Sequence, residues 1–157
     1  MIRISFVKRV ALMCALIAVS SHSFANANNS PVGYWQTIDD VSGKAKSIVQ
    51  ISELPDHSLE GKVVKLYTDP NKVCVACKGD KKDKPILGMV IMQGLKQVTD
   101  TPNLWSSGKI LDPKNGKTYQ CDIKISSDNK ELNVRGYIGL SLFGRTQTWK
   151  SVPNSMS

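Results

Sequence analysis

The fold is decided by the stretch Thr118-Tyr119-Gln120-Cys121-Asp122-Ile123-Lys124-Ile125, in which polar and apolar side chains alternate without interruption. A period of two residues is typical of a β-strand with one face in the core and one face in solvent. Asp112-Pro113-Lys114-Asn115-Gly116 precedes it and has the composition of a tight turn, while residues 126–130 form a second polar turn. The stretch therefore predicts a half-buried strand between two hairpin turns.

The same pattern of strands and turns recurs along the chain from Trp35 onward. Short apolar runs are separated by the turn residues Gly, Asn, Asp and Pro, and no stretch has a helical period. We predict an all-β domain, a single antiparallel up-and-down barrel of about eight strands. At that number a closed barrel has no free edges and is wide enough to enclose one small ligand. The expected strands cover residues 34–38, 46–53, 59–67, 86–92, 104–111, 118–125, 132–138 and 144–152.

The expected strand Ile86 to Met92 is apolar on both faces. Such a run is normally covered on both sides. Another segment of the chain, a second subunit or a ligand must then lie over its outer face, and the sequence leaves the three open.

The N-terminus has the three parts of a secretory signal peptide, with basic residues at Arg3, Lys8 and Arg9 and an apolar run over residues 10–19. Small residues place the cleavage site after Ala27, with Ala25 as the alternative. We therefore expect an exported, periplasmic protein with a signal peptide at 1–27, a barrel domain at 28–152 and a short tail at 153–157. The apolar run is about half of the roughly 20 residues that a membrane-spanning helix needs, so no membrane anchor is expected.

The net charge of the chain is +8, and it falls to +5 when the three basic residues of the signal are removed. Acidic residues are interleaved with the basic ones throughout, whereas a nucleic-acid-binding protein gathers its basic residues on one face. We expect no nucleic-acid partner. Anionic surfaces of the cell envelope stay open as partners, and the run Lys78 to Lys84 is expected to be a solvated loop.

Three cysteines follow the signal peptide, namely Cys74, Cys77 and Cys121. In an oxidising compartment we expect Cys74 and Cys77 to form a disulfide that pins their loop and Cys121 to be an inert core thiol. A thiol-redox pair is an alternative, although it lacks the usual helix after the first cysteine. A zinc site using His57 lacks a second close pair of ligands, so we expect no metal and no cofactor, and His57 reads as a surface residue.

Several motifs resemble a known bacterial family along nearly the whole chain from Pro31 to Val152. They are Gly33-Tyr34-Trp35-Gln36-Thr37-Ile38-Asp39-Asp40, Cys74-Val75-Ala76-Cys77-Lys78-Gly79, Pro85-Ile86-Leu87-Gly88-Met89, Gly108-Lys109-Ile110-Leu111-Asp112-Pro113, Asn115-Gly116-Lys117, Arg135-Gly136-Tyr137 and Phe143-Gly144-Arg145-Thr146-Gln147-Thr148-Trp149. The family is domain of unknown function 2147 (DUF2147). The resemblance implies an exported protein with a lipocalin-like barrel.

Gly33 and Trp35 also resemble the Gly-x-Trp signature of the first lipocalin strand. That resemblance implies that Trp35 closes the bottom of the barrel and that a late arginine stacks on its ring. Arg145 is the candidate for this partner, and Arg135 is the second choice.

The chemistry-bearing residues do not favour an enzyme. The segment Gly139 to Gly144 lacks the spacing and the following helix of a hydrolase nucleophile turn. We therefore expect a non-enzymatic carrier or sensor that binds a small apolar or amphipathic ligand, and the candidate binding residues inside the barrel are Trp35, Val49, Ile51, Met89, Tyr119 and Ile123. The first alternative is an envelope protein–protein interaction module or homodimer with a solid barrel, which would use the apolar 86–92 strand and the lysine-rich loop. The second is a thiol-redox protein using Cys74 and Cys77.

Overall fold

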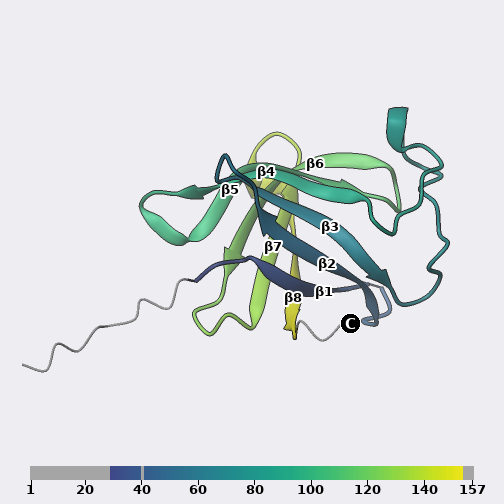
Figure 1. The fold of residues 1–157 in the computed structure, drawn as a ribbon. Coiled ribbons are helices and arrows are strands. Elements are labelled where there is room, and N and C mark those ends of the chain that lie inside the picture. The colour runs from purple at the N-terminus through teal and green to yellow at the C-terminus, as the bar shows by residue number, and fades with distance from the viewer. Residues whose placement is uncertain (1–28, 40, 154–157) are drawn as a thin grey trace, which may run out of the picture.

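The computed structural model describes residues 29–39 and 41–153 (Figure 1). The expected signal peptide, its cleavage site and most of the C-terminal tail lie outside these residues. The described chain forms eight antiparallel strands that close into a barrel in sequence order, with β8 pairing back onto β1. The strands are β1 (Gly33–Ile38), β2 (Ala45–Glu53), β3 (Leu59–Leu66), β4 (Val90–Val98), β5 (Thr101–Asp112), β6 (Lys117–Ile125), β7 (Glu131–Tyr137) and β8 (Arg145–Val152).

The predicted all-β, up-and-down barrel is confirmed, and most strands begin and end within three residues of their expected positions. The alternating stretch at 118–125 lies in β6, where Cys121, Ile123 and Ile125 are fully buried and Gln120 and Lys124 are exposed. This is the pattern that a closed barrel imposes, because every strand turns one face to the interior and one to solvent. Within the described residues, no helix has the length and apolar character needed to cross a membrane.

The expected fourth strand at 86–92 is wrong in its position, since β4 begins at Val90 and continues to Val98. Residues 86–89 turn instead, because Gly88 adopts a positive φ of 83° and its N–H donates to the carbonyl of Val63. The turn brings Ile86 and Met89 onto the hydrophobic core, where both are buried. The apolar run 86–92 is thus covered by the chain itself.

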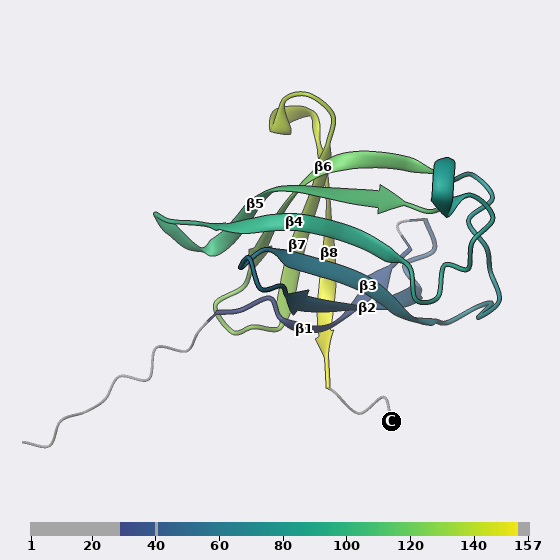
Figure 2. The ribbon, with the colours of Figure 1, turned by 45° about the horizontal axis from the view of Figure 1, so that its top comes forward.

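The two ends of the barrel differ in their connections (Figures 1 and 2). We call one the closed end, which holds the three short turns 54–58, 99–100 and 126–130 together with the entering segment 29–32. We call the other the mouth end, which holds the connections 39–44, 67–89, 113–116 and 138–144. Figure 2 shows the last of these rising clear of the barrel above β6, while the longest one lies beyond the ends of β3 to β6.

The long loop, residues 67–89, is fixed against the rim of the mouth end. Cys74 and Cys77 form the predicted disulfide, and the Val73–Pro85 bridge closes the base of the loop. Gly116 permits the contact with the neighbouring turn, because a Cβ atom there would lie 1.8 Å from the carbonyl oxygen of Ala76. A short 3₁₀ helix, η1 (Gly79–Lys81), ends the disulfide segment.

Candidate ligand site in the barrel

The interior at the closed end is sealed by apolar side chains. Trp35 projects inward from β1 and is 2% exposed, and its indole N–H donates to the carbonyl of Pro31 at 2.7 Å. Pro31 is itself fully buried, so the segment that enters β1 closes this end of the barrel. Around it the inward positions of the other strands are filled by Ile51, Leu59, Leu95, Trp105, Ile123, Ile125, Leu132 and Trp149, all within the same core cluster.

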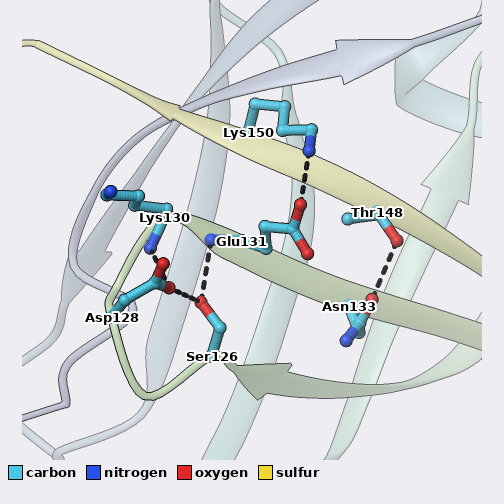
Figure 3. A network of polar contacts seen from close by, with 7 residues as sticks. All are labelled: Ser126, Asp128, Lys130, Glu131, Asn133, Thr148 and Lys150. Carbon is cyan, nitrogen blue, oxygen red and sulfur yellow. Dashed lines mark hydrogen bonds and ion pairs between the residues drawn. The ribbon is translucent and has the colours of Figure 1, made fainter.

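The turn between β6 and β7 strengthens the closed end from outside (Figure 3). The Ser126 hydroxyl bonds Asp128 at 2.7 Å and accepts the backbone N–H of Glu131 at 2.9 Å, while Asp128 also accepts the N–H of Lys130. These contacts hold the pKa of Asp128 below its usual range, first through the Ser126 hydroxyl. Glu131 also pairs with Lys150 on β8, which links the turn to the next strand.

Polar side chains face the interior on the side of the barrel formed by β8, β1 and β2. Thr37 and Ser47 are both buried, and their hydroxyls bond each other at 2.7 Å across the β1–β2 pair. The indole N–H of Trp149 donates to the side-chain oxygen of Gln147, the next residue facing the same way along β8. One wall of the interior thus provides hydroxyl and amide groups, as a site for an amphipathic molecule requires.

On β5 and β6 the inward positions become more exposed toward the mouth end. Tyr119 and Ile110, which pair across β5 and β6, are only partly buried. Gly136 stands beside them on β7, and a Cβ atom there would meet the Cβ of Tyr119 at 3.6 Å and Ile110 at 3.7 Å in ordinary contact. Met89, on the long loop, belongs to the buried core cluster. On β5 and β6 the inward side chains are therefore less buried at the mouth end than at the closed end.

The six candidate binding residues lie on or beside one interior, but not at one depth. Trp35, Val49, Ile51 and Ile123 are part of the solid core, with exposed fractions of 0–2%. Met89 and Tyr119 lie toward the mouth end instead, and the Tyr119 hydroxyl accepts a hydrogen bond from Asn115 in the rim turn. The structure brings them together as lining residues and leaves their role in binding a prediction.

The expected stacking of Arg145 on Trp35 is wrong. Trp35 pairs with Ser151 near the closed end, whereas Arg145 begins β8 at the mouth end, six residues earlier. At about 3.3 Å per strand residue the two lie roughly 20 Å apart, which is beyond the reach of an arginine side chain. The closure of the barrel at Trp35 uses Pro31 in place of an arginine.

Arg135, the second choice for that partner, is occupied elsewhere. It lies on the outer face of β7, and its guanidinium donates to the carbonyls of Ser141 and Leu142 and to the Thr146 hydroxyl. Arg135 therefore fixes the connection between β7 and β8. This role was not predicted from the sequence. The available signal was an arginine shortly before an irregular segment, because the carbonyl groups of such a segment are not paired in a strand and can accept hydrogen bonds from a guanidinium.

Two surface clefts accompany the barrel. The smaller, of about 310 Å³, lies at the mouth end over β5, β6 and β7 and is lined by Lys109, Thr118, Tyr119, Gln120, Tyr137, Ile138 and Gly139. The larger, of about 590 Å³, lies at the closed end beside the start of β1 and includes Asn129, whose buried side-chain oxygen lacks a hydrogen-bond partner among the described residues. Both are open to solvent, whereas the inward side chains at the centre of the barrel belong to one buried core cluster.

Among the described residues, Cys74, Cys77, Cys121 and His57 are not arranged for redox or metal chemistry. Both half-cystines of the disulfide are buried, and η1 is too short to act on either sulfur. Cys121 is a free core thiol, as predicted, and burial together with the charge of Asp122 raises its pKa to about 12. His57 lies in the turn at the opposite end, bonded to Glu53. The described residues hold no cluster of His, Cys, Asp or Glu suited to a metal ion.

The closed eight-stranded antiparallel barrel, sealed around a tryptophan at one end, defines a lipocalin-like protein. The likeness extends to a solved structure, protein HP1028 from the human pathogen Helicobacter pylori, which is described as belonging to the lipocalin family. The two share 20% sequence identity with a TM-score of 0.69, over 80% of this chain and 84% of that chain. The TM-score shows a common fold, and at this level of identity the likeness extends to the fold alone.

The chain belongs to the family described as an uncharacterized protein conserved in bacteria (DUF2147), whose sequence model matches residues 33–151. The match runs from the first residue of β1 to the next-to-last residue of β8, so it covers the whole barrel. Comparison with curated proteins finds no match.

Proposed function

We propose that this protein is an exported, periplasmic, non-enzymatic carrier or sensor that binds a small apolar or amphipathic molecule in its barrel from the mouth end. The observation that supports this proposal is the difference in burial between the inward positions at the closed end and those of β5 and β6 at the mouth end. The former are sealed around Trp35 and Pro31, and the latter are partly exposed at Tyr119 and Ile110. A lipocalin-like fold is typically non-enzymatic, which agrees with this role.

The ligand is expected to displace side chains, because the centre of the barrel is filled. Met89 is the side chain best placed to move, since it reaches the interior from a turn and methionine adapts its shape at low cost. The polar wall of Thr37, Ser47 and Gln147 would receive the polar end of an amphipathic ligand. A purely apolar ligand would remain against Ile110 on β5, which lies across the barrel from β1 and β2.

The proposal is tested by titration with a dansyl-labelled fatty acid. Trp35, Trp105 and Trp149 are all buried in the interior, so a ligand in the barrel would receive energy from them. We expect saturable energy transfer, together with a non-covalent adduct in native mass spectra of protein extracted gently from its host. Absence of both the saturable signal and the adduct across several preparations would overturn ligand binding.

A matched pair of variants locates the probe. Gly136→Leu adds a side chain that points toward Tyr119 and Ile110, so it should fill the accessible interior and weaken binding by about tenfold or more. Asn133→Leu places the same side chain on the outward face of the same strand and should leave binding unchanged. Equal affinity of both variants would show that the probe binds outside the barrel.

The interaction-module alternative loses the apolar part of the surface on which it was based, although the lysine-rich loop is exposed. Ile86, Met89, Ile91 and Met92 are buried within the chain, and Leu87 is the exposed large apolar residue of this run. The thiol-redox alternative is disfavoured by the burial of both half-cystines. Ligand binding in the barrel is therefore the function that the geometry supports best.

A further inference from the structure

Exposed apolar side chains gather at the mouth end. Of the large apolar residues that are exposed within residues 29–39 and 41–153, only Val32 lies at the closed end, and the others are Val41, Tyr67, Val73, Val75, Leu87, Ile138, Leu140, Leu142 and Phe143. The last four are 68–79% exposed and come from one connection, residues 138–144, which we call the apolar loop. Exposed apolar side chains concentrated on one short connection indicate an interaction surface.

The apolar loop is held in shape by its own contacts. Arg135 binds the carbonyls of Ser141 and Leu142, and residues 141–143 form the 3₁₀ helix η2. Gly144 lies so close to the carbonyl of Gly136 that a Cβ atom there would be 2.8 Å from that oxygen. Carbonyl groups of the apolar loop are therefore hydrogen-bonded by a side chain of the barrel. The loop itself projects clear of the barrel in Figure 2.

The mouth end is also strongly basic. Counted along the sequence, its connections and the strand residues within three positions of them hold twelve basic residues, namely Lys44, Lys46, Lys65, Lys72, Lys78, Lys81, Lys82, Lys84, Lys114, Lys117, Arg135 and Arg145. The acids in the same positions are six: Asp39, Asp40, Asp69, Asp80, Asp83 and Asp112. The closed end has the opposite balance, with Lys96, Lys124, Lys130 and Lys150 against Glu53, Asp56, Glu60, Asp100, Asp128 and Glu131.

Exposed apolar tips and an excess of basic residues at the same end of the barrel match the interface of an anionic lipid bilayer. Its acyl region accepts apolar side chains, and its phosphate layer attracts lysine and arginine. A second copy of the chain fits less well, because two basic mouth ends would repel each other at close range. We propose that the mouth end docks on an anionic membrane surface, with the apolar loop inserted between the lipid headgroups.

The cleft of about 310 Å³ supports this orientation, because it lies at the base of the apolar loop. Ile138 and Gly139 form one side, and Lys109, Thr118 and Gln120 supply polar groups on the other. A phosphate headgroup beside an inserted loop would meet the Lys109 ammonium there. This docking depends on the surface alone and holds whether or not the barrel binds a ligand.

The test is flotation of the purified protein with vesicles of phosphatidylcholine alone or containing about 30% phosphatidylglycerol. Binding should require phosphatidylglycerol and weaken at high salt, because ionic screening removes the cationic contribution. Leu142→Glu combined with Phe143→Glu should weaken binding at least about tenfold, since two inserted apolar side chains become charged. Val32→Glu, the matched control at the closed end, should bind as the wild type does.

A second pair of variants tests the cations separately. Lys78→Gln with Lys84→Gln should weaken vesicle binding by about fivefold for each lysine, whereas Lys124→Gln with Lys130→Gln at the closed end should not. Loss of binding on changing Val32 but not the apolar loop would overturn the proposal, as would absence of binding to anionic vesicles. Sedimentation equilibrium showing a dimer that the apolar-loop variant dissociates would assign the surface to a second copy instead.

Discussion

The two ends of the barrel differ in how they use the same strands. At the closed end short turns join strands whose inward side chains pack without access to solvent, and the Ser126–Asp128 contacts fix one of these turns. At the mouth end longer connections carry exposed apolar tips, and the inward residues Tyr119 and Ile110 remain partly exposed. This difference indicates that the closed end contributes most of the stability, because it is tightly packed, and that the more exposed mouth end is the place for binding.

The largest expected effect is the loss of the tryptophan at the closed end. Trp35→Ala removes a buried indole and its hydrogen bond to Pro31, so the free energy of unfolding should fall by about 3–5 kcal/mol. Tyr119→Ala at the mouth end should cost only about 1 kcal/mol, because the ring is already partly exposed. Urea unfolding followed by far-ultraviolet circular dichroism measures both. Equal losses would remove the distinction between the ends.

Gly116 provides the next test, which concerns how the long loop attaches to the mouth end. Gly116→Ala combines a positive φ of 68° with a Cβ atom 1.8 Å from the carbonyl of Ala76, so we expect a loss of about 2 kcal/mol or more. Gly139→Ala has a similar φ of 73° but open space around it, so strain alone should cost about 1 kcal/mol. Thermal unfolding compares the two. A larger loss at Gly139 would contradict the close approach at Gly116.

The barrel could be predicted from the sequence because its signal is local. Alternation at Cys121 and Ile123 and turn residues such as Pro113 and Gly116 specify strands and hairpins one at a time. The misplaced fourth strand shows where this fails, since residues 86–89 are as apolar as a strand. They turn because the chain must return from the long loop onto the core, which is a tertiary constraint.

The candidate site was harder to predict, again because it depends on tertiary structure. The family signature correctly placed Trp35 inside the barrel, but the partner of its ring depends on how far apart two residues of β1 and β8 lie once the barrel closes. That distance excluded Arg145. The role of Arg135 and the basic mouth end likewise depend on which connections share an end, and this becomes visible only when strand directions are known.

The disulfide should stabilise the mouth end only. Cys74→Ser with Cys77→Ser opens a small covalent loop, and chain entropy predicts a loss of about 2 kcal/mol. Hydrogen exchange should become faster in residues 67–89 and stay unchanged near Ile125 and Leu132, whose burial does not depend on the long loop. Faster exchange at both ends to the same degree would show that the ends are coupled.

Cys121 gives a pH-dependent test of the packing between the two ends. The folded thiol keeps its proton up to its raised pKa of about 12, whereas the unfolded thiol ionises near its ordinary value of 9.0. The contribution of the protonated Cys121 thiol to the free energy of unfolding is therefore complete below pH 9. It is lost progressively as the pH rises toward 12, and the loss is roughly 1 kcal/mol at pH 10. Urea midpoints between pH 7 and 10.5 should decline more steeply for the wild type than for Cys121→Ala. Parallel curves would place Cys121 in contact with water.

The smallest expected effect on stability, and the most specific for the mouth end, belongs to Arg135. Arg135→Lys keeps the positive charge but cannot donate to Ser141, Leu142 and Thr146 together, so stability should change by less than about 1 kcal/mol. The apolar loop should nevertheless exchange its backbone hydrogens faster, and binding to anionic vesicles should weaken about twofold to threefold, because a looser loop must be ordered on insertion. Wild-type vesicle binding together with faster exchange would mean that the apolar side chains act without being held in place. Wild-type exchange would mean that the loop keeps its shape through η2 and Gly144 alone, and that the guanidinium contributes only its charge.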